Sequence, residues 1–563
     1  MIEEKIISAL QKATGNKEIQ LETPENEEFG DYTTNVALQS KDKNPRKFAE
    51  EIVEKLKANK KLKEYVEKID VAGPGFINFW FNKKYLYDTL NSIVNHFDVF
   101  KKSEKLKNQK IMVEFAHPNT HKAFHIGHLR NIITGESLVR LLESQGARVV
   151  RVNYQGDVGM HIAKCLWGYL NSDLSEIEKR IGKALNNASP NDKAEVLGSF
   201  YAIGSQKFET DDKAKLEIEE INSQIYTGNP KIWEIYQKTR RWSLEYFDCI
   251  YKRLYTTFDR LYFESEVFES GKEKALDALK NKIFEVSDGA IIFPGSKYGL
   301  HDRVFVSSKG TPTYEAKELG LAALQFGEHN PDKIIHLVST EQIGYFQVLI
   351  KALEIIMPES KGKEVHQIYG WVKLKEGKMS SRMGNVVLGE MLLDETKKEI
   401  KKNYDADEVV AEQIAVGAVK YSFLKVGLTQ EITYDIKESV SSEGNSGPYI
   451  QYTYARTNSV KQKSNKEISK LSDLKEALNT EERSLLRSFT RFPGILVNAT
   501  KNYSPSILCS YLYDLSQKYN AFYNKHKIID SDNEGFRLAI NSATGKILKK
   551  GLDLLGIQAP ERM

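Results

Sequence analysis

The sequence predicts an α/β fold in which a long helical insertion interrupts a parallel sheet. A small α/β unit precedes this sheet and an all-helical bundle follows it. Three observations support the prediction. Short apolar strands alternate with amphipathic helices over residues 106–170 and again from about 290. Residues 170–290 are helical, charged and weakly patterned, as in an insertion. From about residue 385 onward, the periodic segments all have helical apolar spacing.

Composition is consistent with a large globular protein. A chain of 563 residues should hold roughly three to four domains. The net charge of +4 is small for this length, so it permits nucleic-acid binding by local patches without favouring it. The three cysteines form no CxxC pair, which argues against a disulfide framework or a Cys-rich zinc site. There is no signal-peptide pattern and no run of 18 apolar residues. These features favour a cytoplasmic protein without membrane contact.

The expected elements follow in chain order. The N-terminal domain, residues 1–105, should contain helices at 2–13, 48–56 and 84–97 and a strand at 71–81. The sheet domain, 106–385, should contain strands at 111–115, 148–154, 290–293, 303–307 and 333–339, with helices starting at Gly127 and at 314 and 342. A connecting helical region covers 386–440. The helical bundle, 441–563, follows this region. The helices predicted in these two regions are 406–426, 447–461, 482–498, 505–526 and 537–555.

A histidine motif follows the strand at 111–115. In His125-Ile126-Gly127-His128, two imidazoles flank a glycine where a strand gives way to a helix. The glycine lets a nucleotide approach the backbone, and the helix N-terminus favours phosphate. The imidazoles can donate hydrogen bonds to phosphate oxygens in a transition state. Two alternatives remain open: a metal site formed by His121, His125 and His128, and an ordinary polar turn.

A second motif lies about 250 residues later. Lys378-Met379-Ser380-Ser381-Arg382 stands between Gly377 and Gly384, which suggests a mobile loop. A lysine on such a loop can close over a triphosphate and neutralise charge that develops on the departing pyrophosphate. The alternative is a solvated basic loop. The two motifs together predict one ATP site.

This pair of motifs resembles the two signatures of class I aminoacyl-tRNA synthetases. Four further segments are similar to arginyl-tRNA synthetases in particular: residues 447–456 (GPYIQYTYAR), 559–563 (APERM), 30–35 (GDYTTN) and 72–78 (AGPGFIN). The resemblance implies a Rossmann-like catalytic domain, an N-terminal domain that contacts tRNA and a helical anticodon-binding domain. It also implies that tRNA must be bound before arginine is activated, and that the chain is a monomer.

The resemblance implies an arginine pocket, and the residue types agree with it. Glu114 ends a strand at the sheet edge where ligands of such folds bind, and Asn119 lies on the adjoining loop. Tyr314 and Glu318 are four residues apart and so share a helix face. Carboxylates and phenol oxygens suit the donor fork of a guanidinium. A substrate-contacting glutamine is expected at Gln342, with Gln347 as the alternative.

The implied chemistry is attack of the arginine carboxylate on the α-phosphorus of ATP. His125 and His128 would stabilise the transition state, while Lys122 and Lys378 would stabilise the departing pyrophosphate. Mg²⁺ would accompany ATP, with no metal cage of the protein's own. The expected ATP-binding residues are Asn119, His125, Gly127, His128, Lys378, Met379, Ser380 and Ser381. The arginyl-adenylate would then pass to tRNA(Arg).

Contacts to tRNA are expected at four residues. These are Asn35 in the N-terminal domain and Tyr449, Tyr452 and Arg456 at the start of the bundle. Aromatic side chains can stack on unpaired bases, and arginine can meet phosphates. The alternative is that most tyrosines of this region belong to the helical core.

The chain departs from the family pattern in four places. Glu318 stands where Asp is usual, and Tyr345 where His is familiar. Ser381 replaces the second lysine of the class I loop, and the resemblance implies that Lys122 offsets this loss. Val158 replaces a frequent Trp in the Gly156-Asp157-Val158-Gly159 turn. Two rival functions remain: a class I synthetase for another amino acid, and a non-catalytic RNA-binding relative.

Overall fold

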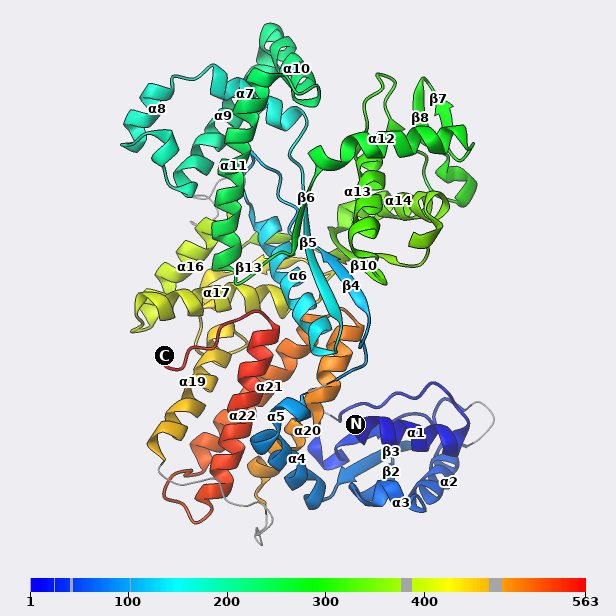
Figure 1. Ribbon diagram of the computed structural model, residues 1–563. Coiled ribbons are helices and arrows are strands. Elements are labelled where there is room, and N and C mark those ends of the chain that lie inside the picture. Colours follow the sequence, from blue (N-terminus) through cyan, green and yellow to red (C-terminus); the bar gives the residue numbers. More distant parts are fainter. Residues whose placement is uncertain (1, 25, 41–43, 102, 376–386, 465–477) are drawn as a thin grey trace. The chain divides into compact units, whose positions relative to one another are not determined.

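The computed structural model describes residues 2–24, 26–40, 44–101, 103–375, 387–464 and 478–563. The chain divides into two compact units (Figure 1). One unit consists of Met1–Ser103, Ser442–Leu554 and Gln558–Met563. The other consists of Glu104–Ser441 and Leu555–Ile557. We call them the terminal unit and the central unit and describe each by itself.

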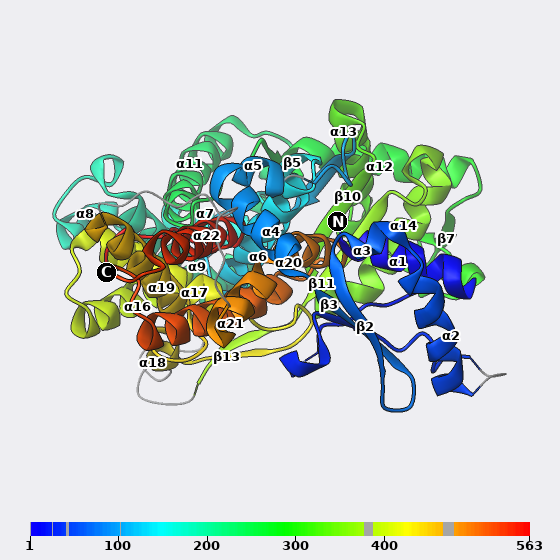
Figure 2. The same ribbon diagram turned by 90° about the horizontal axis from the view of Figure 1, so that it is seen from below.

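The first part of the terminal unit packs helices against a three-stranded antiparallel sheet of order β1-β3-β2. Helix α2 lies beside β2 in both views (Figure 1, Figure 2). Its elements are α1 (Ile2–Thr14), η1 (Glu27–Phe29), β1 (Tyr32–Thr34), α2 (Pro45–Lys57), α3 (Lys60–Lys63), β2 (Val66–Ala72), β3 (Phe76–Phe81), α4 (Lys83–Asn95) and α5 (Phe97–Phe100). The single strand predicted at 71–81 is wrong: Gly73 and Gly75 have φ of 53° and 142°, and the chain turns back there to form a hairpin.

In its described residues, the second part of the terminal unit is a bundle of four long helices, α19 (Gly447–Lys463), α20 (Thr480–Lys501), α21 (Pro505–Lys525) and α22 (Glu534–Leu554). Arg487 of α20 joins the bundle to the N-terminal segment. Its Nε lies 2.5 Å from Asp31 Oδ1, and its Nη atoms donate to the backbone carbonyls of Glu27 and Gly30. Burial raises the pKa of Asp31 even though Arg487 opposes the shift. This buried pair therefore fixes the end of η1 against α20.

The central unit is built on a parallel five-stranded sheet of order β11-β10-β4-β5-β6. Its strands are β4 (Lys110–Glu114), β5 (Arg148–Gln155), β6 (Arg260–Phe263), β10 (Lys333–Ser339) and β11 (Glu364–Tyr369). Helices α6 (Ile126–Ser144), α13 (Tyr314–His329) and α14 (Ile343–Ile356) connect them, with η4 (Thr340–Gln342) and η5 (Pro358–Ser360). The predicted fold class is confirmed. The carboxyl ends of β4, β5 and β10 share one edge, which carries the residues considered below.

Two details of the predicted sheet are wrong. The segments at 290–293 and 303–307 are strands, but they form a separate antiparallel sheet of β7 (Glu285–Ser287), β8 (Ala290–Phe293) and β9 (Arg303–Val306), with η3 (Gly295–Tyr298). A tight turn at Asp288-Gly289, both at positive φ, makes β7 and β8 a hairpin, which cannot belong to a parallel array. Conversely, the edge strand β6 lies inside the predicted insertion. It was missed because four residues between helices are too few to show the alternation of apolar and polar side chains that is typical of a strand.

Most of the rest of the insertion is helical. Its helices are α8 (Leu174–Ile181), η2 (Leu185–Asn187), α9 (Pro190–Thr210), α10 (Asp212–Tyr226), α11 (Pro230–Arg253) and α12 (Glu264–Lys280), and α7 (Met160–Leu170) precedes them. One core contains Leu166, Ile218 and Tyr236, and a second contains Phe200 and Trp242. The insertion therefore has apolar cores of its own.

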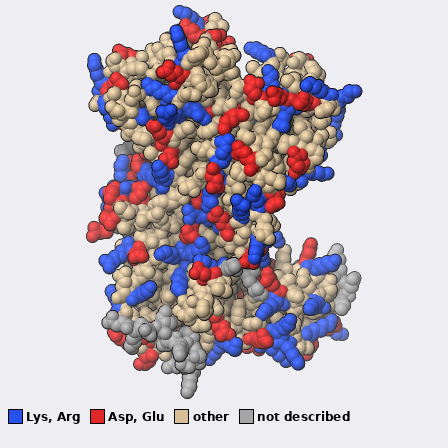
Figure 3. Space-filling model, viewed as in Figure 1, with Lys and Arg blue, Asp and Glu red and all other residues tan. Residues whose placement is uncertain are grey.

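The central unit ends in α16 (Gly389–Asn403), α17 (Glu408–Leu424), β13 (Ile432–Tyr434) and α18 (Ile436–Ser439). The all-helical prediction for this region is wrong at β13, which pairs in parallel with β12 (Val372–Leu374). Lys and Arg lie interspersed with Asp and Glu over the face seen in Figure 3, in keeping with the small net charge. None of the helices in the described part of the chain combines the length and apolar character that crossing a membrane requires.

Candidate active site

The loop after β4 has an unusual backbone. Ala116 and His117 have φ of 82° and 49°, in the left-handed region that residues other than glycine seldom adopt. Two buried side chains hold them there. Asn131 Oδ1 accepts from Ala116 N at 2.6 Å, and Asn153 Oδ1 accepts from His117 N at 3.1 Å. Strain maintained in this way is typical of functional loops.

The histidine motif forms the N-terminal cap of α6. His125 is the cap residue, and its Nδ1 accepts from Gly127 N at 3.1 Å. His128 Nδ1 accepts from His125 N at 3.2 Å, and the two rings stack with centroids 3.8 Å apart. Because each Nδ1 is an acceptor, each neutral ring carries its proton on Nε2. Burial lowers the pKa of both imidazoles, so both are neutral donors near pH 7.

The motif is hydrogen-bonded to the segment that follows the predicted basic loop. Ile126 N donates to Val387 O and Gly389 N donates to Phe124 O, each at 2.9 Å. On the preceding side, Arg130 of α6 donates to Trp371 O at 2.9 Å. Both stems of the loop are therefore anchored to α6 or to the turn before it. Lys378, Met379, Ser380 and Ser381 lie outside the described residues.

His121 is separated from the other two histidines of the motif. It is buried, its Nε2 lies 2.8 Å from Thr239 Oγ1, and its Nδ1 lies 3.0 Å from Thr120 Oγ1. Its φ of 60° places it before the helix begins. Within the ranges that the structure describes, no group of three or more His, Cys, Asp or Glu side chains could hold a metal ion.

Buried charges form the other end of the sheet edge. Glu114 is 1% exposed, with Oε1 3.1 Å from His336 Nδ1 and Oε2 2.5 Å from Gln325 Nε2. The other ring nitrogen of His336, Nε2, lies 2.5 Å from Glu364 Oε2. Glu318 and Gln325 are seven residues apart on α13 and share a face. Burial and the Glu114 carboxylate raise the pKa of Glu318 well above its ordinary value. A group of carboxyl side chains with few counter-charges suits a cationic ligand.

A further acid, Glu264, lies close to Asn119, a predicted site residue. A Cβ on Gly156 would lie 2.2 Å from Asn119 Oδ1 and 3.5 Å from Glu264 Oε1, so these side chains meet over the glycine. Glu264 is buried and pairs with Lys317 at 2.6 Å. Its charge also contributes to the raised pKa of Glu318. Sequence reasoning missed Glu264 because it missed β6, the strand immediately before it; an acid at a strand's carboxyl end was the available signal.

The remaining predicted pocket residues are more exposed. Tyr314, the first residue of α13, is 65% exposed, and Lys317 Nζ lies 5.1 Å from its ring centroid. Gln342 and Gln347 are both exposed, and Gln342 Oε1 accepts from Ser339 N at 3.4 Å. Tyr345 belongs to the acidic cluster: burial and Glu318 raise its pKa. The three exposed side chains have room to meet a ligand.

Lys122 and Val158 lie in the turns that flank this site. Lys122 Nζ is 5.7 Å from the Tyr201 ring centroid. Val158 is 3% exposed in a core of the insertion, where it contributes packing. Next to it, Asp157 accepts from Tyr236 Oη at 2.9 Å and Ser265 Oγ at 2.7 Å and pairs with Arg240 at 2.8 Å. The Gly156–Gly159 turn is thus tied to α11 and α12.

The residues predicted to contact tRNA lie in the terminal unit. The Arg456 guanidinium lies close to two exposed aromatic rings, those of Tyr452 at 4.9 Å and Tyr523 at 4.8 Å, and its Nη1 donates to Asn520 Oδ1. Tyr449 Oη accepts from Asn520 Nδ2 at 3.0 Å and is tied into the bundle. Asn35 is partly exposed and accepts from Gln39 Nε2 at 3.1 Å.

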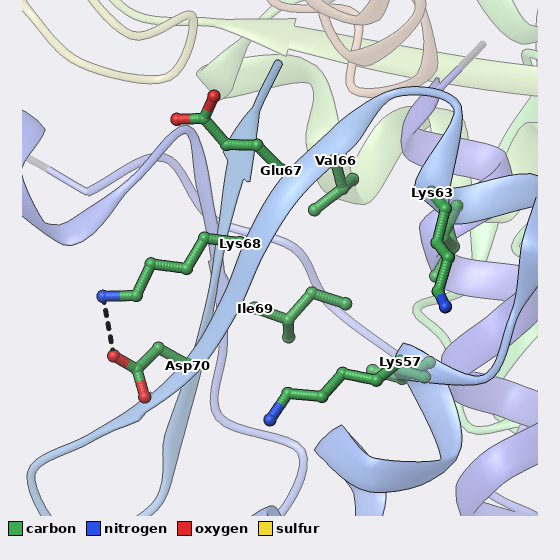
Figure 4. A pocket seen from close by; sticks show the side chains of 9 residues that line it. Lys57, Lys63, Val66, Glu67, Lys68, Ile69 and Asp70 are labelled. Atoms are coloured by element: carbon green, nitrogen blue, oxygen red, sulfur yellow. Dashed lines mark ion pairs between the residues drawn. The ribbon is translucent and has the colours of Figure 1, made fainter.

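A hollow of about 490 Å³ opens beside β2, lined by Leu56, Lys57, Leu62, Lys63 and residues 66–70. Lys57, Lys63 and Lys68 are among the side chains that line it (Figure 4). Lys68 pairs with Asp70 at 2.8 Å, as the dashed line in Figure 4 marks, and Lys57 pairs with Glu54 at 3.0 Å. Three lysines and the two acids Glu67 and Asp70 therefore line the hollow.

Comparison with known proteins identifies the family. The chain matches the catalytic domain of class I (R) tRNA synthetases over residues 89–436. It matches the DALR anticodon-binding domain over 450–563 and the arginyl-tRNA synthetase N-terminal domain over 1–81. The chain belongs to the arginyl-tRNA synthetase family.

Individual relatives of this arginyl-tRNA synthetase family member agree along its length. The arginine–tRNA ligase of Phocaeicola vulgatus is 32% identical, with 100% of each chain covered. That of Borrelia hermsii is 32% identical over 87% of this chain and 86% of its own. Among solved structures, Thermus thermophilus arginyl-tRNA synthetase superposes with a TM-score of 0.83 at 24% identity, covering 100% of both chains, which shows the shared fold. The predicted resemblance is confirmed.

Proposed function

We propose that this chain is an arginine–tRNA ligase. It joins L-arginine to the 3′ end of tRNA(Arg), with ATP as the energy source, through an arginyl-adenylate, and it releases AMP and diphosphate. The observation that carries this proposal is the edge of the central sheet. Neutral imidazoles cap a helix there, and a cluster of buried and half-buried carboxyl groups lies on the neighbouring strands and α13.

At the ATP end, the residues act by position and by partial charge. The Nε2–H groups of His125 and His128 donate to phosphate oxygens as charge builds on them, and the α6 N-terminus adds its dipole. Gly127 keeps this turn open: a Cβ there would lie 2.9 Å from Cε1 of the His125 ring. Asn119 and the loop residues Lys378, Met379, Ser380 and Ser381 complete the ATP site. Mg²⁺ accompanies ATP and needs no dedicated protein cage.

At the arginine end, charge does the recognition. Glu114 and Glu318 meet the cationic groups of the substrate, Asn119 orients it, and Tyr314 and Gln342 contact it from the rim, with Gln347 as the alternative glutamine. Glu264, beside Asn119, joins this set. Arginine bound here presents its carboxylate to the α-phosphorus of ATP for in-line attack. Lys122 and Lys378 stabilise the negative charge of the departing diphosphate.

The terminal unit supplies tRNA contacts. The exposed Tyr452–Arg456–Tyr523 stack can accept unpaired bases on its aromatic faces, and Tyr449 supports it through Asn520. Asn35 and the lysines around the hollow beside β2 add contacts to the phosphate backbone. We further propose that the chain acts as a monomer in the cytoplasm.

A charging assay tests the function directly. Purified protein, ATP, Mg²⁺ and total tRNA are incubated with each of the twenty amino acids. We expect arginine alone to become acid-insoluble with tRNA. Preference for another amino acid would make the chain a different class I synthetase, and no charging at all would favour an RNA-binding relative without catalysis.

The role of Lys378 has its own test. Lys378→Ala should reduce the aminoacylation rate about 100-fold, because charge on the leaving diphosphate is no longer stabilised. Binding of tRNA, measured by filter retention, should change less than about two-fold, since the loss is confined to the transition state. Equal losses in rate and in tRNA affinity would contradict this role.

A further inference from the structure

A charged network crosses three strands under the proposed arginine site. Glu114 of β4 and His336 of β10 are direct partners in the strand register, so their side chains lie side by side on one face. Glu364 of β11 lies diagonally across from His336, on the same face of the sheet. All three residues are at most 6% exposed. The alternation of strand side chains therefore places an imidazole between two carboxylates where water is excluded.

Between two ionised carboxylates, the geometry sets the protonation state of this imidazole. Nδ1 lies 3.1 Å from Glu114 Oε1, and Nε2 lies 2.5 Å from Glu364 Oε2. An ionised carboxylate can only accept a hydrogen bond, and a neutral imidazole has one N–H, so a neutral ring would leave one carboxylate facing a lone pair. A ring with two N–H groups satisfies both acceptors. Both ring nitrogens therefore donate.

The charges around His336 also favour a ring that carries both protons. The groups that face the ring are Glu114, Glu318, Glu364, His117 and His366. Burial opposes charge on His336, but Glu114 and Glu364 outweigh it and raise its pKa well above the ordinary value. The His336 charge in turn lowers the pKa of Glu114 against burial, as Gln325 and His117 also do. The pKa values of His117 and His366 are lowered, first by burial, so neither competes for the proton.

We infer that His336 is a positioning residue for the amino-acid substrate: a permanently charged imidazolium, clamped by Glu364, that holds the Glu114 carboxylate ionised and oriented at the arginine site. This inference rests on the proposed function for the identity of the substrate. Glu114 Oε1 is held by His336 and Oε2 by Gln325, and each oxygen keeps a lone pair for the ligand. Glu364 is the anchor, and its effect on the substrate runs through His336.

Glu364→Gln tests the anchor without touching Glu114. With one carboxylate neutralised, His336 binds its proton less tightly and loses it as the pH rises. The neutral ring can then no longer donate to both neighbours. We expect the arginine KM to rise about ten-fold relative to wild type at pH 8.5 and less than about three-fold at pH 6.5, with kcat and the ATP KM within about two-fold. An exposed histidine of the same unit provides the matched control, and His301→Gln should match wild type at both pH values.

A spectroscopic measurement decides the charge independently of activity. Histidine-labelled apo protein is titrated by NMR, and the His336 signal is identified by its loss in His336→Gln, or by its shift in Glu364→Gln if the first variant does not fold. We expect the wild type to give an imidazolium signal throughout the pH range of the kinetic assays. A His336 signal that titrates near pH 7 or below would overturn the inference.

The two failures can be told apart. If the wild-type protein charges no arginine, the proposed function fails, and the NMR titration still decides whether His336 is a clamped imidazolium. If the wild type charges arginine and Glu364→Gln has an unchanged arginine KM from pH 6.5 to 8.5, the positioning role fails although the function stands.

Discussion

The two ends of the proposed site use histidine in opposite ways. At the ATP end, His125 and His128 accept backbone N–H groups on Nδ1, and burial holds their pKa values below the ordinary value. At the arginine end, His336 donates to carboxylates from both nitrogens, and its pKa is raised. All three rings lie in the same unit. Their different charge states therefore follow from their hydrogen-bond partners more than from burial itself.

The difference matches the charge that each end must meet. A neutral Nε2–H can strengthen its bond as negative charge develops on phosphate, with no proton to move. A cationic substrate needs carboxylates that remain ionised while buried, and such carboxylates need a buried counter-charge. Glu114 has that counter-charge in His336. Glu318 has none so close among the described residues, and its pKa rises.

The largest expected effect separates two functions of the His128 ring: its Nδ1 accepts a hydrogen bond in the helix cap, and its Nε2 donates to phosphate. His128→Asn keeps an acceptor for His125 N but removes the Nε2 donor, whereas His128→Gln can keep a donor in the place of Nε2. We expect kcat to fall about 100- to 1000-fold in His128→Asn and no more than about ten-fold in His128→Gln. Steady-state aminoacylation measures both, with thermal unfolding as the check on folding. A smaller loss in His128→Asn than in His128→Gln would show that the ring serves the helix cap alone.

The next effect belongs to the charged end. Glu318→Gln keeps the size of the side chain and removes its charge, so the arginine KM should rise about 100-fold, the scale of one charge-assisted contact. The ATP KM should stay within about two-fold because the two ends act separately. Initial rates over a matrix of both substrates give these constants. A parallel rise in the ATP KM would break the comparison by showing that the ends are coupled.

A smaller effect is expected in the terminal unit, where a cation is held by aromatic rings. Arg456→Ala removes the centre of the Tyr452–Tyr523 stack and should raise the tRNA KM about five- to ten-fold, the scale of one stacking contact. The arginine KM should not change. Lys461→Ala, five residues further along α19, is the matched control for lost positive charge. An equal effect of both variants would indicate general electrostatic attraction in place of stacking.

Sequence predicted most of the fold because long helices have a strong period. The helix at 505–526 is observed at Pro505–Lys525, and the strand at 333–339 is observed at Lys333–Ser339. The short strands β6 and β13 carry too few residues to show a period. His336 and Glu364 were missed for another reason: their pairing depends on strand order and register, which local patterns do not encode. The roles of the predicted site residues stay predictions.

The smallest expected effect is on the stability of Glu318→Gln: the substitution should stabilise the protein although it weakens arginine binding. A carboxyl whose pKa is raised in the folded protein binds its proton more tightly there than in the unfolded chain. Its contribution to stability is therefore present below the unfolded pKa and is lost as the pH rises above 4.5 through the raised value. Glu318→Gln removes that loss, so the Tm of the central unit at pH 8 should rise by about 2–4 °C. At pH 4.5 the two proteins should differ less.

Calorimetric scans at both pH values measure this difference in Tm. A variant less stable than wild type at pH 8 would mean that Glu318 is a paired structural charge. A gain in Tm together with a loss of arginine affinity would instead show that the arginine end retains an unfavourable buried acid because its substrate is a cation.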